Sequence, residues 1–190
     1  MTFKKCIPTA IFLRKRTNST ESSIPKRRIL GIDPGSRRTG YGIVSYDGSQ
    51  ARFIECGCIT TKSTTPPNRL GEIFSGVELL IKEYRPHEVA IEQVFVSKNA
   101  QSALKLGQAR GAALVAAVKA ELPVHEYAAR LVKQSVVGTG RASKAQVQHM
   151  VQVVLALSAQ PSSDAADALA IALCHVNTHY SQLTRQSNAR

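Results

Sequence analysis

The fold is decided by the stretch RILGIDPGSRRTGYGIV, residues 28–44. Its first apolar run ends in one acid, Asp33, followed directly by a Pro-Gly turn, and this pattern predicts a fully buried strand. A lone carboxylate at the end of such a strand is costly unless a basic side chain or a metal ion pairs with it. The second run, over residues 39–46, reaches the hairpin signal Asp47-Gly48, so residues 51–60 are expected to return as a third strand.

The rest of the chain alternates between helical and extended patterns. Strands are predicted over 87–96 and 123–127, and helices over 69–84, 99–122, 128–137, 145–157 and 162–176. Strands that come first and then alternate with helices indicate an α/β fold, here a mixed five-stranded sheet with helices on both faces. One domain over 29–180 is expected, with a basic, disordered extension over 1–28 and a flexible tail over 181–190.

The net charge of +12 on 190 residues favours an anionic partner, of which nucleic acid is the commonest. Residues 1–28 hold eight basic residues and one acid, so this extension carries +7 of the charge and the body is only mildly basic. The extension resembles either a degenerate targeting signal or an addition before the true start. No apolar run reaches the ~18 residues of a membrane span, so no membrane association is expected.

Three other acids share the unusual setting of Asp33. Glu92 lies inside the apolar stretch VAIEQVF, and Asp164 and Asp167 share one face at the start of the last helix. Two strands and one packed helix can therefore bring four carboxylates together. Oxygen ligands of this kind suit Mg²⁺ or Mn²⁺, and two such ions ~3.5–4 Å apart can promote phosphodiester hydrolysis.

Each acid also has a structural explanation. Asp33 can cap its turn, Asp164 is favoured at a helix N-terminus by the dipole, and Glu92 can pair with Arg110 or Lys133. Taken singly, these explanations compete evenly with a metal site, but all of them would have to hold at once.

Basic and aromatic residues near the acids suggest a nucleic-acid surface. Lys133 and Lys144 flank a glycine-bearing loop that can approach a phosphate backbone, although a solvated basic face is the alternative. Phe95 follows Glu92 by three residues and either stacks on a base or packs in the core. His175 and His179 have the i, i+4 spacing of metal ligands, but surface histidines are the preferred interpretation.

The four cysteines, Cys6, Cys56, Cys58 and Cys174, form no CxxC pair. Buried thiols are favoured over a zinc site, and nothing suggests disulfides, so a reducing compartment is expected. Cys56 and Cys58 are expected on the same face of their strand.

Several stretches together resemble the RuvC family of bacterial Holliday-junction resolvases. They are ILGIDPGSRRTGYGIV, IEQVFVSKNAQSALKLGQARGAALVAAV, EYAARLVKQSVVGTG, KAQVQHMV and DAADALAIALCH, which occur in the expected order over about residues 29–177. The resemblance implies a ribonuclease-H-like fold and a magnesium-dependent homodimer. Such enzymes cut two opposed strands of a four-way junction symmetrically, leaving 5′-phosphate and 3′-hydroxyl ends.

The resemblance also assigns roles to residues and partners. It implies catalytic and metal-binding roles for Asp33, Glu92, Asp164 and Asp167, and DNA contacts for Phe95, Lys133 and Lys144. It implies two Mg²⁺ ions per site, with Mn²⁺ as a substitute, and the branch-migration proteins RuvA and RuvB as partners. Action in recombination, DNA repair and the SOS response within the cytoplasm follows from the same resemblance.

Two rival functions are considered. An actin-like phosphotransferase also opens with a strand, an acid and a glycine-bearing turn, but generally needs two such domains around a nucleotide. A junction-binding module without nuclease activity would have no reason to cluster carboxylates opposite phosphates.

Overall fold

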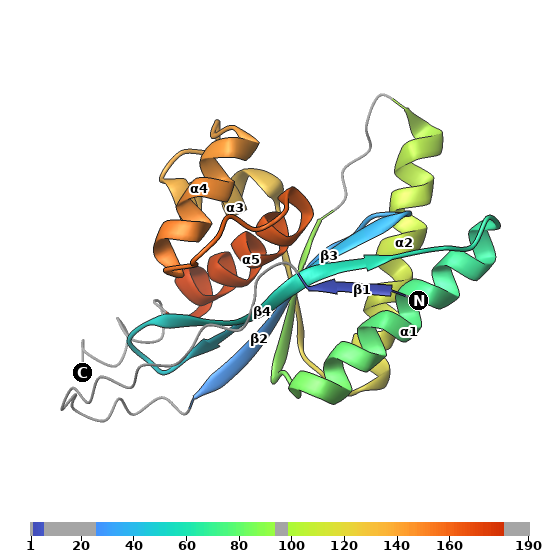
Figure 1. The fold of residues 1–190 in the computed structure, drawn as a ribbon, viewed down its shortest axis with the longest axis horizontal. Helices are drawn as coiled ribbons and strands as arrows, with labels where there is room; N and C mark the ends of the chain where they lie inside the picture. The colour runs from blue at the N-terminus through green and yellow to red at the C-terminus, as the bar shows by residue number, and fades with distance from the viewer. Residues whose placement is uncertain (1, 6–25, 94–98, 181–190) are drawn as a thin grey trace.

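The computed structural model describes residues 2–5, 26–93 and 99–180. Helices and strands alternate after an initial set of strands, as predicted (Figure 1). The strands are β1 (Thr2–Lys5), β2 (Arg27–Asp33), β3 (Arg38–Tyr46), β4 (Ala51–Thr60), β5 (Glu88–Glu92) and β6 (Val124–Tyr127); the helices are α1 (Pro66–Tyr84), α2 (Ala100–Lys119), α3 (Ala129–Val137), α4 (Lys144–Val154), α5 (Ser163–His175) and the π-helical η1 (Val176–Tyr180).

The strands form one mixed sheet in the order β1-β4-β3-β2-β5-β6. The β2–β3–β4 meander is antiparallel, whereas β5 and β6 add on the other side of β2 in parallel. Strand β2 is therefore central, which explains why its sequence is apolar on both faces. The predicted mixed sheet is confirmed, including the hairpin at Asp47-Gly48.

The sheet separates two layers of helices (Figure 1). Helices α1 and α2 cover one face, and α3, α4 and α5 cover the other. Side chains of β2 alternate between the two cores: Ile29 packs with the α5 side, whereas Leu30 and Ile32 pack with the α1–α2 side. The same alternation places Asp33 on the α5 face.

The sheet has one strand more than the five predicted. Strand β1 pairs antiparallel with β4, with Thr2 opposite Thr60, so residues 2–5 belong to the sheet and not to a disordered extension. The physical reason is that β4 would otherwise be an edge strand, whose unpaired N–H and C=O groups accept a further strand regardless of its side-chain pattern. Residues 6–25 and 181–190 lie outside the described residues.

Helix α5 packs closely on the sheet because glycines face it. A Cβ atom at Gly31 would collide with the carbonyl oxygen of Ala168, and one at Gly40 would collide with that of Asp164. Ser162 is the N-cap of this helix. The glycines thus bring the beginning of α5 directly onto the ends of β2 and β3.

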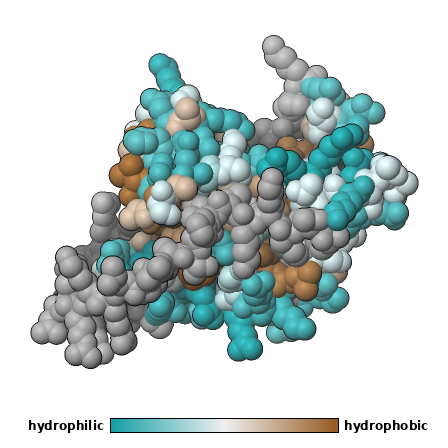
Figure 2. All heavy atoms as spheres, in the orientation of Figure 1, coloured by the Kyte–Doolittle hydropathy of each residue, from teal (hydrophilic) through white to brown (hydrophobic). Residues whose placement is uncertain are grey.

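The surface in Figure 2 is mostly hydrophilic, with apolar patches. Within the described ranges the exposed large apolar side chains are Leu79, Leu104, Val115, Val118, Leu131, Val153 and Val154. The described helices include none long and apolar enough to cross a bilayer. Cys56, Cys58 and Cys174 are buried thiols on the α5 side of the molecule, as the sequence predicts.

Candidate active site

Two carboxylates stand at neighbouring strand ends. Asp33 is the last residue of β2 and Glu92 the last of β5, and the parallel pairing of Ile32 with Ile91 brings these ends side by side. Both point to the α5 face, because each lies an even number of residues from a strand residue in that core, Ile29 or Ala90. Since the sheet is rigid here, both carboxylates are held by backbone pairing on neighbouring strands.

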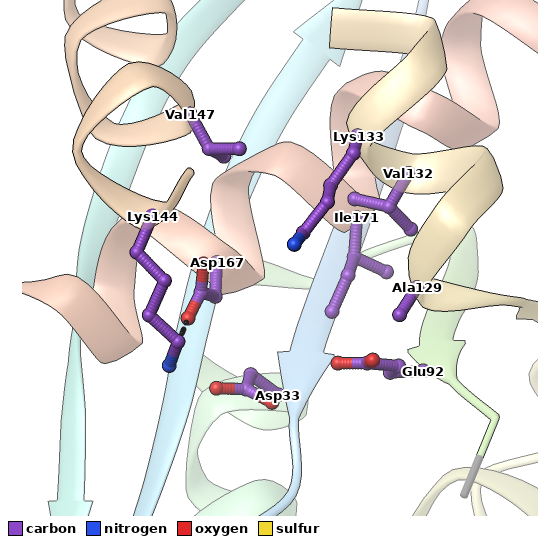
Figure 3. Close-up of a pocket in the computed structure, with 9 residues that line it drawn as sticks. All are labelled: Asp33, Glu92, Ala129, Val132, Lys133, Lys144, Val147, Asp167 and Ile171. Atoms are coloured by element: carbon purple, nitrogen blue, oxygen red, sulfur yellow. Dashed lines mark hydrogen bonds and ion pairs between the residues drawn. The ribbon is translucent and has the colours of Figure 1, made fainter. Parts of the chain in front are cut away.

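The first turns of α5 supply two further carboxylates. Asp167 points toward Asp33 and Glu92, and all three line one pocket (Figure 3). Two predicted DNA contacts line the same pocket, Lys133 from α3 and Lys144 from the beginning of α4. Its apolar wall is formed by Ala129, Val132, Val147 and Ile171. We call this the acidic pocket.

The acidic pocket raises the pKa of Asp33 to about 8. Burial is the main cause, followed by the nearby charges of Asp167, Glu92 and Asp164, while Lys144 acts in the opposite direction. Without a cation, Asp33 therefore holds a proton near neutral pH. A carboxyl group of this kind marks a place where negative charge exceeds what the protein itself compensates.

The negative charge of Asp167 also raises the pKa values of Glu92 and Lys144. The pKa of Glu92 is raised by burial and then by Asp167, although Lys144 and Lys133 lower it. The pKa of Lys144 is raised, mainly by Asp167, whose carboxylate lies 3.4 Å from the ammonium group. Lys144 thus partly neutralises the pocket, but its side chain is 75% exposed and reaches in from solvent.

Asp164 lies beside the acidic pocket and is not part of its lining. Its carboxylate pairs with the guanidinium of Arg38, at 2.9 Å, and lies 3.9 Å from the thiol of Cys58. The structure therefore brings three of the four predicted acids into one pocket and holds the fourth next to it. Asp164 remains close enough for its charge to raise the pKa of Asp33.

The structure supports only some of the purely structural roles considered for the acids. Arg110 does not bind the Glu92 carboxylate: its Nε donates to the Glu92 backbone oxygen, and its guanidinium pairs with Glu126 at 2.6 Å. Lys133 faces Glu92 across the pocket (Figure 3). The turn after Asp33 is closed instead by Thr39, which donates to the Gly35 carbonyl oxygen.

Sequence reasoning missed Arg38. The signal available was the pair Arg37-Arg38, which follows the Pro-Gly turn after one serine; Arg38 is the first residue of β3. The interpretation of His175 as a surface histidine is wrong, because its side chain is fully buried. Phe95 lies outside the described residues.

The acidic pocket fits a hard divalent cation. Three carboxylates converge without an equal number of buried cations, and one of them must bind a proton for the charges to coexist. Carboxylate oxygens are the ligands that Mg²⁺ and Mn²⁺ prefer, and a bound cation would replace that proton. Divalent-metal dependence is therefore consistent with the side chains present.

Comparison with known proteins agrees with the resemblance seen in the sequence. The family described as "Crossover junction endodeoxyribonuclease RuvC" matches residues 29–175. A protein of that name from Vibrio campbellii is 60% identical over 151 residues, which are 80% of this chain and 87% of the relative.

Solved structures show the same architecture. The structure titled "T. thermophilus RuvC in complex with Holliday junction substrate" superposes with a TM-score of 0.75 at 38% identity, over 83% of this chain and 96% of that one. The yeast mitochondrial Holliday junction resolvase Ydc2 superposes with a TM-score of 0.64 at 17% identity, over 86% of this chain and 82% of that one. Ydc2 supports the fold alone, which is the ribonuclease-H-like fold that the resemblance implied.

Proposed function

The chain belongs to the RuvC family of crossover junction endodeoxyribonucleases, and we propose that it resolves four-way DNA junctions by cutting two opposed strands at the acidic pocket. The carrying observation is the pocket itself, in which Asp33, Glu92 and Asp167 converge beneath Lys133 and Lys144. Acids at the bottom and lysines at the rim suit a phosphodiester that must be held near a bound cation. The products are expected to carry 5′-phosphate and 3′-hydroxyl ends.

We assign the metal-binding role to Asp33, Glu92 and Asp167, with Asp164 joining them. Two Mg²⁺ ions are proposed, with Mn²⁺ as a substitute; when bound, they would supply a water of lowered pKa and offset negative charge on the reacting phosphate. A bound cation would favour the ionised form of Asp33, which the pocket otherwise opposes. Asp164 must exchange its Arg38 partner to take part, so Arg38 is available to a DNA phosphate at that point.

The lysines are assigned to the DNA. Lys144 is largely exposed and pairs with Asp167 at 3.4 Å, so its ammonium group can move to a phosphate and leave Asp167 to the cation. Lys133 projects into the pocket from α3, opposite Lys144 (Figure 3). We keep Phe95 as a proposed stacking contact with an unpaired base.

A homodimer fits both the substrate and the surface. A four-way junction has approximate two-fold symmetry, and a two-fold dimer would present two equivalent pockets to it. Helix α2 buries Ala109, Ala113 and Ala116 against the core but exposes Val115 and Val118, so it retains an apolar outer face for a second copy. RuvA and RuvB as partners, and a cytoplasmic role in recombination, repair and the SOS response, remain proposals from the family.

Substitution of the acids tests this proposal. Asp33→Asn and Glu92→Gln should retain junction binding and reduce cleavage by at least ~100-fold, because charge stabilisation at the reacting group is lost. The measurement is single-turnover cleavage of a labelled junction in Mg²⁺, with binding followed separately by gel shift.

Glu78→Gln is the matched control. Glu78 is a surface acid on α1 that pairs with Lys119, on the other face of the sheet from the pocket. Near-normal cutting by Asp33→Asn or Glu92→Gln would overturn the assignment of the metal site.

A further inference from the structure

A second polar cluster lies at the opposite end of α5 from the acidic pocket. It consists of Glu88 at the beginning of β5, His125 on β6, His175 at the end of α5 and His179 on η1. Glu88 lies four residues from Glu92, about 13 Å along the strand. We call these four residues the histidine cluster; the proposed reaction uses none of them.

Three members offer ligand atoms that converge. One atom each from Glu88, His125 and His175 lies within 4.8 Å of the other two. The Oε2 atom of Glu88 is 2.7 Å from Nε2 of His175 and 3.6 Å from Nε2 of His125. Ligand atoms around a tetrahedral Zn²⁺ ion lie about 3.3 Å apart, so the two separations from the Glu88 oxygen need adjustments of well under 1 Å. The ligand atoms of His125 and His175 lie within 4.8 Å of each other, so they need to approach by at most about 1.5 Å.

Outer hydrogen bonds orient the inner groups. The hydroxyl of Tyr127 lies 2.7 Å from Nδ1 of His175, and Tyr180 donates to the other oxygen of Glu88. A metal-binding imidazole typically donates its second N–H to an outer acceptor, which fixes its ring. When His175 donates its Nδ1–H to Tyr127, its Nε2 atom carries a lone pair that faces the Glu88 carboxylate oxygen. Both of these atoms are then acceptors, and at 2.7 Å they need a cation or a proton between them.

The remaining rings make this place suited to a cation. His125 packs 4.5 Å from His175 and His179 lies 5.0 Å from both, measured between ring centroids. Burial, followed by the charges of these two neighbours, lowers the pKa of His125, so its neutral, ligating form prevails near pH 7. The side chain of His175 is fully buried and Glu88 nearly so, whereas His125 is 29% exposed and gives access from solvent.

We propose that Glu88, His125 and His175 bind a divalent transition-metal ion of the Zn²⁺ type, with the His179 ring stacked beside His175. Two imidazoles and a carboxylate suit Zn²⁺ better than Mg²⁺, which prefers oxygen ligands. The ion would fasten β5, β6 and the end of α5 to one another. This is a structural site, and it does not rest on the proposed nuclease function.

Zinc content of the full-length protein tests the site. The parent is the double variant Asp33→Asn, Glu92→Gln, so that retained metal is not held by the acidic pocket. The protein is stripped with chelator, loaded with ZnCl₂, desalted, and analysed for zinc by mass spectrometry. One zinc per chain is expected, together with a rise in melting temperature of roughly 5–10 °C at a hundredfold excess over the dissociation constant.

Two single substitutions added to this parent locate the ion. His125→Gln is partly exposed and should fold, yet it should retain less than a tenth of the zinc. His149→Gln, at an exposed position on α4, should retain all of it. A parent without stoichiometric zinc, or a folded His125→Gln variant with undiminished zinc, would overturn the proposal and leave a proton-linked network in its place.

Discussion

At the scale of the residue, the position of Asp33 explains its chemistry. The strand places it where burial and three neighbouring carboxylates oppose its ionisation, and its pKa rises from 3.8 to about 8. A carboxylate on the protein surface would bind a cation more weakly, because water would already stabilise its charge. Because burial and neighbouring charges oppose the ionised form of Asp33, a bound cation would stabilise that form, which is the role proposed for this residue.

The raised pKa makes the stability of the metal-free protein depend on pH. Between about pH 4 and pH 8 the folded chain holds the Asp33 proton and the unfolded chain does not, so the free energy of unfolding falls as pH rises. Asp33→Asn cannot ionise. The difference in melting temperature between Asp33→Asn and wild type should therefore grow in favour of the variant from pH 5 to pH 8. In the free energy of unfolding, this difference amounts to up to about 1.4 kcal/mol per pH unit.

Asp47→Asn is the control, because the pKa of Asp47 is lowered whereas that of Asp33 is raised. Although burial acts the other way, hydrogen bonds from Gln50, Ser49 and Arg52 lower the pKa of Asp47 to about 2. Its stabilising effect is complete above about pH 4, so this substitution should lower the melting temperature equally at pH 5 and pH 8. A pH-independent difference between Asp33→Asn and wild type would contradict the electrostatic account of the acidic pocket.

Lys133 provides a test of the DNA surface. Lys133→Ala should weaken junction binding and reduce the slope of log affinity against log salt by about 0.9, the value for one phosphate contact. Lys82→Ala, on α1 at the other face of the sheet, should change neither. Binding measured by fluorescence anisotropy over a salt series decides; an unchanged slope for Lys133→Ala removes this residue from the DNA surface.

At the scale of the element, α5 is decisive because its N-terminal end carries two of the acids. Its close approach depends on β2 and β3 having glycine at the positions beneath it, Gly31 and Gly40. The backbone of Asp164 approaches β3 at Gly40, so the close packing of α5 on the sheet also determines where the Asp164 carboxylate lies.

A comparison of Gly40→Ala with Gly71→Ala should distinguish the effect of close packing at Gly40 from the general effect of replacing glycine by alanine. The new methyl group collides with the Asp164 backbone, so we expect a loss of ~1–3 kcal/mol and a fall in cleavage rate. Gly71→Ala, on α1 with open space around it, should instead stabilise the protein by ~0.5–1 kcal/mol. Thermal unfolding of both variants is the measurement; a Gly40→Ala protein as stable as wild type would refute the close-packing argument.

Most elements could be predicted because their signals are local. The buried strand before Asp33 and the hairpin at Asp47-Gly48 each depend on a few adjacent residues. The convergence of Asp33, Glu92 and Asp167 also followed, because strand ends and a helix face have fixed geometry.

The features that were missed depend on contacts distant in sequence. Strand β1 pairs with β4 through backbone groups that every sequence shares, so no side-chain pattern announces it. Arg38 reaches Asp164 across 126 positions, and His175 is buried by Tyr127 and Glu88 from other strands. Helical spacing alone favoured a surface position for His175, and only its tertiary packing shows that it is buried.

At the scale of the whole molecule, the acidic pocket lies on the face of the sheet that α3, α4 and α5 cover. Helices α3 and α4, which carry the two lysines of the acidic pocket, lie on this face of the sheet, while α1 and α2 cover the opposite face (Figure 1). A dimer formed through the exposed side of α2 would keep both pockets accessible. Symmetric cutting of a junction then requires only that both copies bind it together.

The most direct test of the central claim is cleavage of a synthetic four-way junction, with plain duplex of the same sequence alongside. Each strand is labelled in turn, and reactions contain either Mg²⁺ or chelator. We predict paired, symmetric nicks on the junction alone, in Mg²⁺ alone. Tight binding without a nick, across junctions of several sequences in Mg²⁺, would contradict the nuclease account and favour a junction-binding module.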